Sequence, residues 1–132
     1  IEIKALALDS RKVGRGFVYI AVDGEMQHGL QYAKQTQKKG AVVIVYDPLR
    51  SEHFALDQLA IELIAIDDLA FKLGVLANRF YQSPSRKLDV IGITGTNGKT
   101  SCSQFLLQLL PDCGVVGTLG WGEEQTRLKQ TD

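Results

Sequence analysis

The segment from residue 88 to residue 111 restricts the possible folds more than any other part of the chain. An apolar run at 88–93 has the composition of a buried strand, and the sequence T-G-T-N-G-K-T follows at 94–100. The next residues carry apolar side chains at helical spacing until Pro111. A strand, a glycine-rich turn and a helix in this order let main-chain N–H groups and the helix N-terminus point at one anion. The segment is therefore predicted to bind the phosphates of a nucleotide.

The residue types in this loop suit that role. Gly95 and Gly98 allow backbone conformations and a close approach that a side chain would obstruct. Lys99 is expected to reach the β- and γ-phosphates, and the Thr100 hydroxyl is expected to ligate Mg²⁺ bound to them. The general pattern G-x-x-x-x-G-K-S/T is met except at its first position, where this chain has Ile93. We take ATP as the expected nucleotide.

Upstream of this loop, short apolar runs predict the strands of a parallel sheet. They lie at 3–8, 17–22, 41–46 and 61–66, and the run at 17–22 is rich in β-branched and aromatic residues. The run at 41–46 is apolar throughout, which is typical of a strand buried on both faces of a parallel sheet.

Two helices are expected among and after these strands. One covers 30–39, and Gly40 stands where a helix stop is expected. The other begins after Asp67 and Asp68, which can cap it. Its apolar stripe is spaced by four, three and four residues, at Leu69, Leu73, Leu76 and Phe80.

A polar segment at 82–86, which contains Pro84, separates the second helix from the strand at 88–93. We place the domain boundary here. Residues 1–85 are predicted to form a small amino-terminal α/β domain, and residues 86–132 the start of a P-loop-type parallel-sheet domain. Because the chain opens on Ile1 rather than Met, we expect a fragment of a longer protein.

The overall charge disfavours two classes of partner. Fifteen basic residues balance fifteen acidic residues, so no net field favours binding to nucleic acid or to an anionic membrane. There is no uninterrupted apolar run of about 18 residues, and the first residues lack the order of a secretory signal. We expect a cytoplasmic, monomeric protein without membrane insertion, in which Cys102 and Cys113 are buried reduced thiols.

The loop T-G-T-N-G-K-T resembles the nucleotide loop of the Mur ligases and of their folylpolyglutamate synthetase relatives. The resemblance extends over the whole chain, through L-D-S-R at 8–11, G-F-V-Y-I-A at 16–21, Gly24, Gly29, K-G-A at 39–41 and G-V-V-G-T-L-G at 114–120. It is greatest for the ligases that add the third residue of the peptidoglycan stem peptide. The branch that adds D-alanyl-D-alanine shares D-S-R and K-G-A but typically has a Gly-Ser loop where this chain has residues 95–98.

The resemblance implies that the first domain binds the UDP-substrate and the second binds ATP. Positions matching substrate contacts lie in two loops, at Leu8, Ser10, Glu25, Met26 and Gln27. Positions matching the ATP loop are Gly95, Thr96, Asn97, Gly98, Lys99, Thr100 and Ser101. Of these, Thr100 is the expected Mg²⁺ ligand. Lys99 is the expected catalytic residue, because its charge offsets the charge on the transferred phosphoryl group.

Two features of the first domain can have a purely structural role instead of a functional one. Asp9 and Arg11 either form part of the substrate site or simply pair to fix a turn. His28 stands where family members commonly carry Asp, and we expect it to be a solvated loop residue.

The implied reaction is ATP-dependent amide-bond formation on UDP-MurNAc-L-Ala-D-Glu through an acyl phosphate, with meso-diaminopimelate or lysine as the incoming amino acid. The family's carbamylated lysine, its acidic metal ligand and its amino-acid-binding domain would lie beyond Asp132, so we expect this chain to be inactive alone. The alternatives are an isolated UDP-sugar-binding module and the D-alanyl-D-alanine-adding Mur ligase. A P-loop GTPase or kinase ranks last, because no Asp at the end of a downstream strand is visible.

Overall fold

The computed structural model describes residues 2–123 of the chain, which fall into two compact units. The first unit covers Ile1–Lys87 and the second covers Leu88–Asp132. The change from one unit to the other thus lies two residues after the expected boundary at residue 85.

Four parallel strands form the sheet of the first unit, in the order β1-β2-β3-β4. They are β1 (Ala5–Ala7), β2 (Phe17–Ala21), β3 (Val43–Tyr46) and β4 (Glu62–Ala65). The register places Ala7 beside Tyr19, Tyr19 beside Ile44, and Ile44 beside Leu63. The predicted α/β class with a parallel sheet is confirmed, and each of the four expected strands forms within its expected range.

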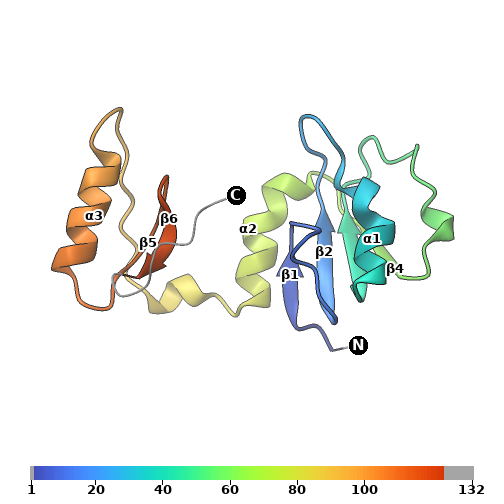
Figure 1. Cartoon of the computed structure of the whole chain (residues 1–132), viewed down its shortest axis with the longest axis horizontal. Helices are drawn as coiled ribbons and strands as arrows, with labels where there is room; N and C mark the ends of the chain where they lie inside the picture. Colours follow the sequence, from blue (N-terminus) through green and yellow to red (C-terminus); the bar gives the residue numbers. More distant parts are fainter. Residues whose placement is uncertain (1, 124–132) are drawn as a thin grey trace. The chain divides into compact units, whose positions relative to one another are not determined.

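The two faces of this sheet bury separate apolar clusters. On one face, Tyr19 and Ile44 pack with Leu30 of the 3-10 helix η1 (Gly29–Tyr32) and with Ala33 of α1 (Ala33–Lys38). On the other face, four strand residues pack against α2 (Leu69–Phe80), namely Val18, Ile20, Val43 and Val45. Figure 1 shows α1 and α2 on opposite sides of the sheet. The sheet is therefore covered by helices on both faces, as parallel sheets usually are.

Helix α2 begins by a different means from the one predicted. Asp68 precedes its first residue with a left-handed φ of 52°, and its side chain makes no capping hydrogen bond. Side-chain caps usually come from residues with extended backbone. The carboxylate of Asp47, which follows β3, accepts a hydrogen bond from the Leu69 N–H at 3.0 Å instead. The expected cap by Asp68 is wrong, because a residue distant in sequence supplies it.

The second unit contains one helix and one hairpin within its described residues. Helix α3 (Lys99–Leu109) matches the predicted helix, and Pro111 follows it. Strand β5 (Gly114–Gly117) pairs in antiparallel fashion with β6 (Gly120–Glu123).

The strand expected at 88–93 does not form. Leu88, Val90 and Ile91 are instead exposed by 66%, 74% and 59%. A strand exists only where a neighbour supplies hydrogen-bond partners, and none of the described residues pairs with this segment. The prediction failed because the apolar pattern belongs to one segment alone, whereas strand formation also requires a partner from another part of the chain.

The remaining elements are two short 3-10 helices, η2 (Leu56–Gln58) and η3 (Pro84–Lys87). None of the helices within residues 2–123 combines the length and the apolar character needed to cross a bilayer. Both cysteines are free, with Cys102 exposed on α3 and Cys113 partly exposed. The expectation that both are buried is therefore wrong.

Candidate functional site

The predicted substrate-binding residues lie at one edge of the parallel sheet. The first loop follows β1 and the second follows β2, and these two strands are neighbours. All carboxyl ends of parallel strands meet at one edge, and α/β proteins bind ligands in the crevices outside it. The fold thus brings the segments around Ser10 and Met26, which are separate in sequence, to the same side of the first unit.

The loop after β1 is held by a charged pair within it. The Asp9 carboxylate accepts hydrogen bonds from the main-chain N–H of Arg11 at 2.8 Å, from its Nε at 3.0 Å and from its Nη2 at 2.9 Å. These hydrogen bonds hold the pKa of Asp9 to about 2. The pair therefore fixes the turn, and this geometry supports the structural alternative for Asp9 and Arg11.

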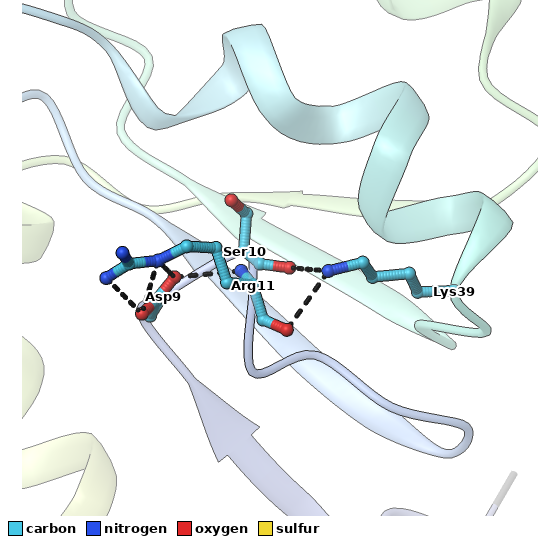
Figure 2. A network of polar contacts seen from close by, with 4 residues as sticks. All are labelled: Asp9, Ser10, Arg11 and Lys39. Atoms are coloured by element: carbon cyan, nitrogen blue, oxygen red, sulfur yellow. Dashed lines mark hydrogen bonds and ion pairs between the residues drawn. The ribbon is translucent and has the colours of Figure 1, made fainter.

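The lysine that follows α1 also binds this loop. Lys39 Nζ donates hydrogen bonds to the main-chain carbonyls of Ser10 at 2.9 Å and Arg11 at 3.0 Å, as Figure 2 shows. Ser10 is only 7% exposed, whereas Leu8 is 54% exposed. Of the two predicted contact residues in this loop, Leu8 presents the larger surface to a ligand.

Sequence reasoning missed this role of Lys39. The signal was present in K-G-A at 39–41, but those residues were interpreted only as the end of a helix and as part of the family resemblance. Gly40 does end the helix with a φ of 94°, and its carbonyl accepts a hydrogen bond from the Gly16 N–H at 2.9 Å.

The loop after β2 is a tight turn closed at its base. Asp23 and His28 form an isolated antiparallel bridge, and the Gly24 N–H donates to the Gln27 carbonyl at 3.2 Å. Glu25 and Met26 therefore occupy the tip of the turn, where Met26 is 93% exposed. The predicted contact residues of this loop thus present side chains to solvent at the carboxyl edge of the sheet.

Side chains from two other segments fix this turn. Arg50 binds the Asp23 carboxylate with its Nε and Nη2, and Nη2 also donates to the Gly24 carbonyl at 2.8 Å. The hydrogen bonds from Arg50 lower the pKa of Asp23. Gln27 Oε1 accepts hydrogen bonds from Gln31 Nε2 at 2.7 Å and from the Tyr32 hydroxyl at 3.0 Å. No sequence pattern pointed to Arg50.

His28 is buried rather than solvated, which corrects the expectation. It is 7% exposed, and its ring lies 5.3 Å from that of Phe54. Its Nδ1 accepts the Leu30 N–H at 3.1 Å and caps η1. The ring proton must then reside on Nε2, which lies 3.0 Å from the Asp47 carbonyl oxygen and donates to it. The expectation was wrong because Asp47 and Phe54, which bury the ring of His28, lie in a segment that follows another strand.

Close packing between β2 and η1 supports the base of the turn. A Cβ on Gly29 would lie 2.7 Å from the Cα of Ala21, so only glycine fits there without a shift. The Tyr19 hydroxyl donates to the Gly29 carbonyl at 2.9 Å, and burial raises the pKa of Tyr19 to about 12.

The phosphate loop precedes α3 in the second unit. Gly95 and Gly98 have φ values of 138° and 77°, a region that favours glycine, so both glycines are required by backbone conformation. Among the described residues no side chain caps the start of α3, which leaves its first N–H groups to an anion. Lys99 Nζ donates to the carbonyls of Gly95 and Thr96. Its ammonium group therefore lies against the loop that is predicted to bind the phosphates.

The other predicted residues of this loop are accessible. Thr96, Asn97 and Ser101 are exposed, and Thr100 is partly exposed. Within residues 2–123, no cluster of three or more His, Cys, Asp or Glu side chains is placed to hold a metal ion. The assignment of Thr100 to Mg²⁺ remains a prediction.

The chain is similar to known proteins over nearly its whole length. The profile described as "Mur ligase family, catalytic domain" matches residues 2–81. Curated UDP-N-acetylmuramoyl-L-alanyl-D-glutamate--2,6-diaminopimelate ligases are 43% identical in Coxiella burnetii and 44% identical in Pseudomonas aeruginosa. The first comparison covers 92% of this chain and 25% of the relative, and the second covers 91% and 25%.

A solved structure of a ligase with the same name has a similar fold. It superposes with a TM-score of 0.66 at 25% identity and covers 96% of this chain and 26% of that one. The chain therefore spans about a quarter of the length of the relatives it matches. The family match over residues 2–81 covers more than half of the chain, and the pairwise similarities extend beyond it. This chain belongs to the Mur ligase family.

Proposed function

We propose that this chain forms the UDP-substrate-binding segment and the phosphate loop of an ATP-dependent ligase that adds 2,6-diaminopimelate to UDP-MurNAc-L-Ala-D-Glu. One observation carries the proposal: identity of 41–44% to three ligases named for diaminopimelate extends over 91–92% of the chain, which includes both units. The proposed amino acid comes from those names, because the residues that would select it are expected to lie beyond Asp132.

In the proposed reaction, the D-glutamate carboxylate attacks the γ-phosphorus of ATP, and ADP leaves. The product is an acyl phosphate. The amine of diaminopimelate then attacks the acyl carbon and loses a proton, and phosphate leaves with the C–O electron pair. Neither step requires a nucleophile from this chain, so its residues act by binding and by offsetting charge.

The residues of the phosphate loop suit ATP and Mg²⁺. Positive φ values at Gly95 and Gly98 and the uncapped start of α3 favour a bound phosphate chain. Lys99 would offset the charge of the γ-phosphoryl group, and Thr100 would hold Mg²⁺. When bound, Mg²⁺ would supply further neutralisation of phosphate charge.

On the substrate side, we assign the UDP-sugar to the edge formed by the loops after β1 and β2. Leu8, Met26 and Glu25 expose side chains there, and Ser10 and Gln27 sit in turns fixed by hydrogen bonds. A preformed edge of this kind loses little conformational entropy on binding.

The proposal is tested with the full-length ligase that carries this chain. ADP release should require UDP-MurNAc-L-Ala-D-Glu together with 2,6-diaminopimelate, and Lys99→Ala should lower kcat by at least about 100-fold. Turnover with lysine but not diaminopimelate would contradict the proposed amino acid. Turnover with UDP-MurNAc-tripeptide and D-alanyl-D-alanine would instead identify the other branch.

The 132-residue chain alone should form no amide, because an acyl acceptor site is not expected within it. Titration of this chain with a UDP-sugar and with Mg·ATP distinguishes the remaining alternative. Tight binding of the UDP-sugar without any binding of ATP, in both the short chain and its parent, would favour a UDP-sugar-binding module over a ligase.

A further inference from the structure

We propose that His28 is a positioning residue for the UDP-substrate: by capping η1 and binding the Asp47 carbonyl, it holds the turn that presents Glu25 and Met26. This inference rests on the proposed function, since it assigns a role to the turn that would contact the substrate. His28 itself is buried and would not touch the ligand.

His28 joins three segments of the first unit. Its backbone pairs with Asp23 across the base of the turn. Its Nδ1 accepts the Leu30 N–H of η1, and its Nε2 donates to the carbonyl of Asp47 after β3. Both ring nitrogens of one buried side chain thus bind main-chain groups, one in η1 and one in the segment after β3.

Helix η1, which His28 caps, is connected to the tip of the turn through Gln27. Helix η1 carries Gln31 and Tyr32, and both donate hydrogen bonds to Gln27 Oε1. If η1 loses its cap, its first turn can shift, and the two donors shift with it. Gln27 also accepts the Gly24 N–H with its carbonyl, so its displacement opens the turn around Glu25 and Met26.

The opposite end of the turn is also bound to the segment after β3. Arg50 binds Asp23 and the Gly24 carbonyl, and Arg50 lies three residues after Asp47. The turn is therefore held to the segment after β3 at both ends, through Asp23 with Arg50 and through His28 with Asp47. If either connection is removed, the turn can move about the one that remains.

The chemistry of the imidazole gives this role a distinctive signature. Nδ1 can accept the Leu30 N–H only while it carries no proton. The charged groups on the packed segments are already engaged: Asp23 pairs with Arg50, and the Asp47 carboxylate accepts from the N–H groups of Leu49 and Leu69. The other titratable groups in these loops, Glu25, Glu52 and His53, are exposed. The ring with its single proton on Nε2 is therefore the form that makes both hydrogen bonds.

The test compares His28→Ala and His28→Asn in the full-length ligase, with His53→Asn as the control for the other histidine of the chain. Asn is a good N-cap, but its shorter side chain does not replace the hydrogen bond from Nε2 to the Asp47 carbonyl. His28→Ala should raise KM for UDP-MurNAc-L-Ala-D-Glu about tenfold, the equivalent of a lost cap. His28→Asn should recover only the part of this loss that comes from the cap, and kcat and the KM for ATP should stay within about twofold in both variants.

The split between KM and kcat and the recovery by His28→Asn separate positioning from a general structural role. A further readout needs no turnover. Without any substrate, amide hydrogen exchange at Gly24 and Leu30 should be faster in His28→Ala than in His28→Asn.

Several outcomes would overturn the proposal. They are an unchanged KM in His28→Ala, a parallel loss in kcat and ATP affinity, no recovery of KM in His28→Asn, or unchanged exchange at Gly24 and Leu30 in His28→Ala. Failure of the proposed function looks different: the wild type itself would show no turnover with the UDP-substrate. The exchange measurement would still decide whether His28 holds the turn.

Discussion

The carboxylate of Asp9 is bound mainly by a single neighbour, Arg11, and this makes its contribution to stability dependent on pH. Because hydrogen bonds from Arg11 lower the pKa of Asp9 to about 2 from its ordinary 3.8, the folded state favours the charged form. This stabilisation is present above the higher value and is lost as the pH falls through the lower one.

Asp9→Asn should therefore unfold more easily than the wild type at neutral pH, and the difference in the free energy of unfolding should vanish between about pH 4 and about pH 2. Urea unfolding at a series of pH values measures it. Asp57→Asn, which changes an exposed carboxylate in η2, serves as the control. A difference for Asp9→Asn that does not change with pH would contradict the assigned cause.

The role of Gly95 and Gly98 in the phosphate loop could be predicted from the sequence, because the backbone conformation at these two positions requires glycine. The roles of His28 and Asp47 could not be predicted in this way. Each depends on groups that become neighbours only when β2 and β3 pair, and neither residue stands in a local pattern that reports those groups.

At the scale of elements, α2 depends on a cap from outside its own sequence. The Asp47 carboxylate accepts both the Leu49 and Leu69 N–H groups. Asp47→Ala should lower the free energy of unfolding by about 2 kcal/mol, because it removes a cap and leaves buried donors unpaired.

Chemical unfolding measures the total effect, and hydrogen exchange at the Leu69 amide locates it. Asp67→Ala is the matched control, since Asp67 was also expected to cap α2 but lies exposed beside its start. Equal destabilisation by the two substitutions would show that Asp47 has no special role.

Two glycines offer a contrast between close packing and open space. A Cβ at Gly29 would meet the backbone of Ala21, whereas a Cβ at Gly74 in α2 would meet nothing within 4 Å. Gly29→Ala should destabilise the protein by about 2 kcal/mol through overpacking. Gly74→Ala should stabilise it by about 1 kcal/mol, because alanine favours helix. Thermal unfolding of the two variants checks both signs, and a shift in the same direction would contradict this view of the packing.

Helices and strands of the first unit could be predicted because their apolar periodicity reflects the two covered faces of the sheet. Leu69, Leu73 and Leu76 pack against one face, as their spacing indicated. The pattern at 88–93 is equally apolar, yet it has no partner strand within the described residues. Local patterns therefore predict an element only where its neighbours are also in place.

For the whole molecule, the two units differ in how completely they bury their apolar residues. The first has clusters on both faces of its sheet. In the second, Phe105, Leu109 and Val116 are exposed by 61%, 75% and 85%. Residues 1–87 alone should therefore unfold cooperatively, whereas residues 88–132 alone should not. Circular dichroism during urea unfolding of each piece tests this, and a gradual transition for residues 1–87 would contradict it.

The family could be predicted from the sequence because the phosphate loop and D-S-R are short motifs with fixed spacing, and the comparisons confirmed it. Which of these residues contact ligands remains a prediction. The fold places their backbones, but contact also depends on a substrate and on parts of the relatives that lie outside the matched quarter.

The strand order of the first unit has a consequence for synthesis on the ribosome. Because β1, β2, β3 and β4 pair in the order in which they occur, each strand needs only the preceding one as its template. Domains generally fold as units during synthesis, beginning with the amino-terminal one. The nascent chain can therefore complete this sheet, and cover it with α2, before the phosphate loop has left the exit tunnel.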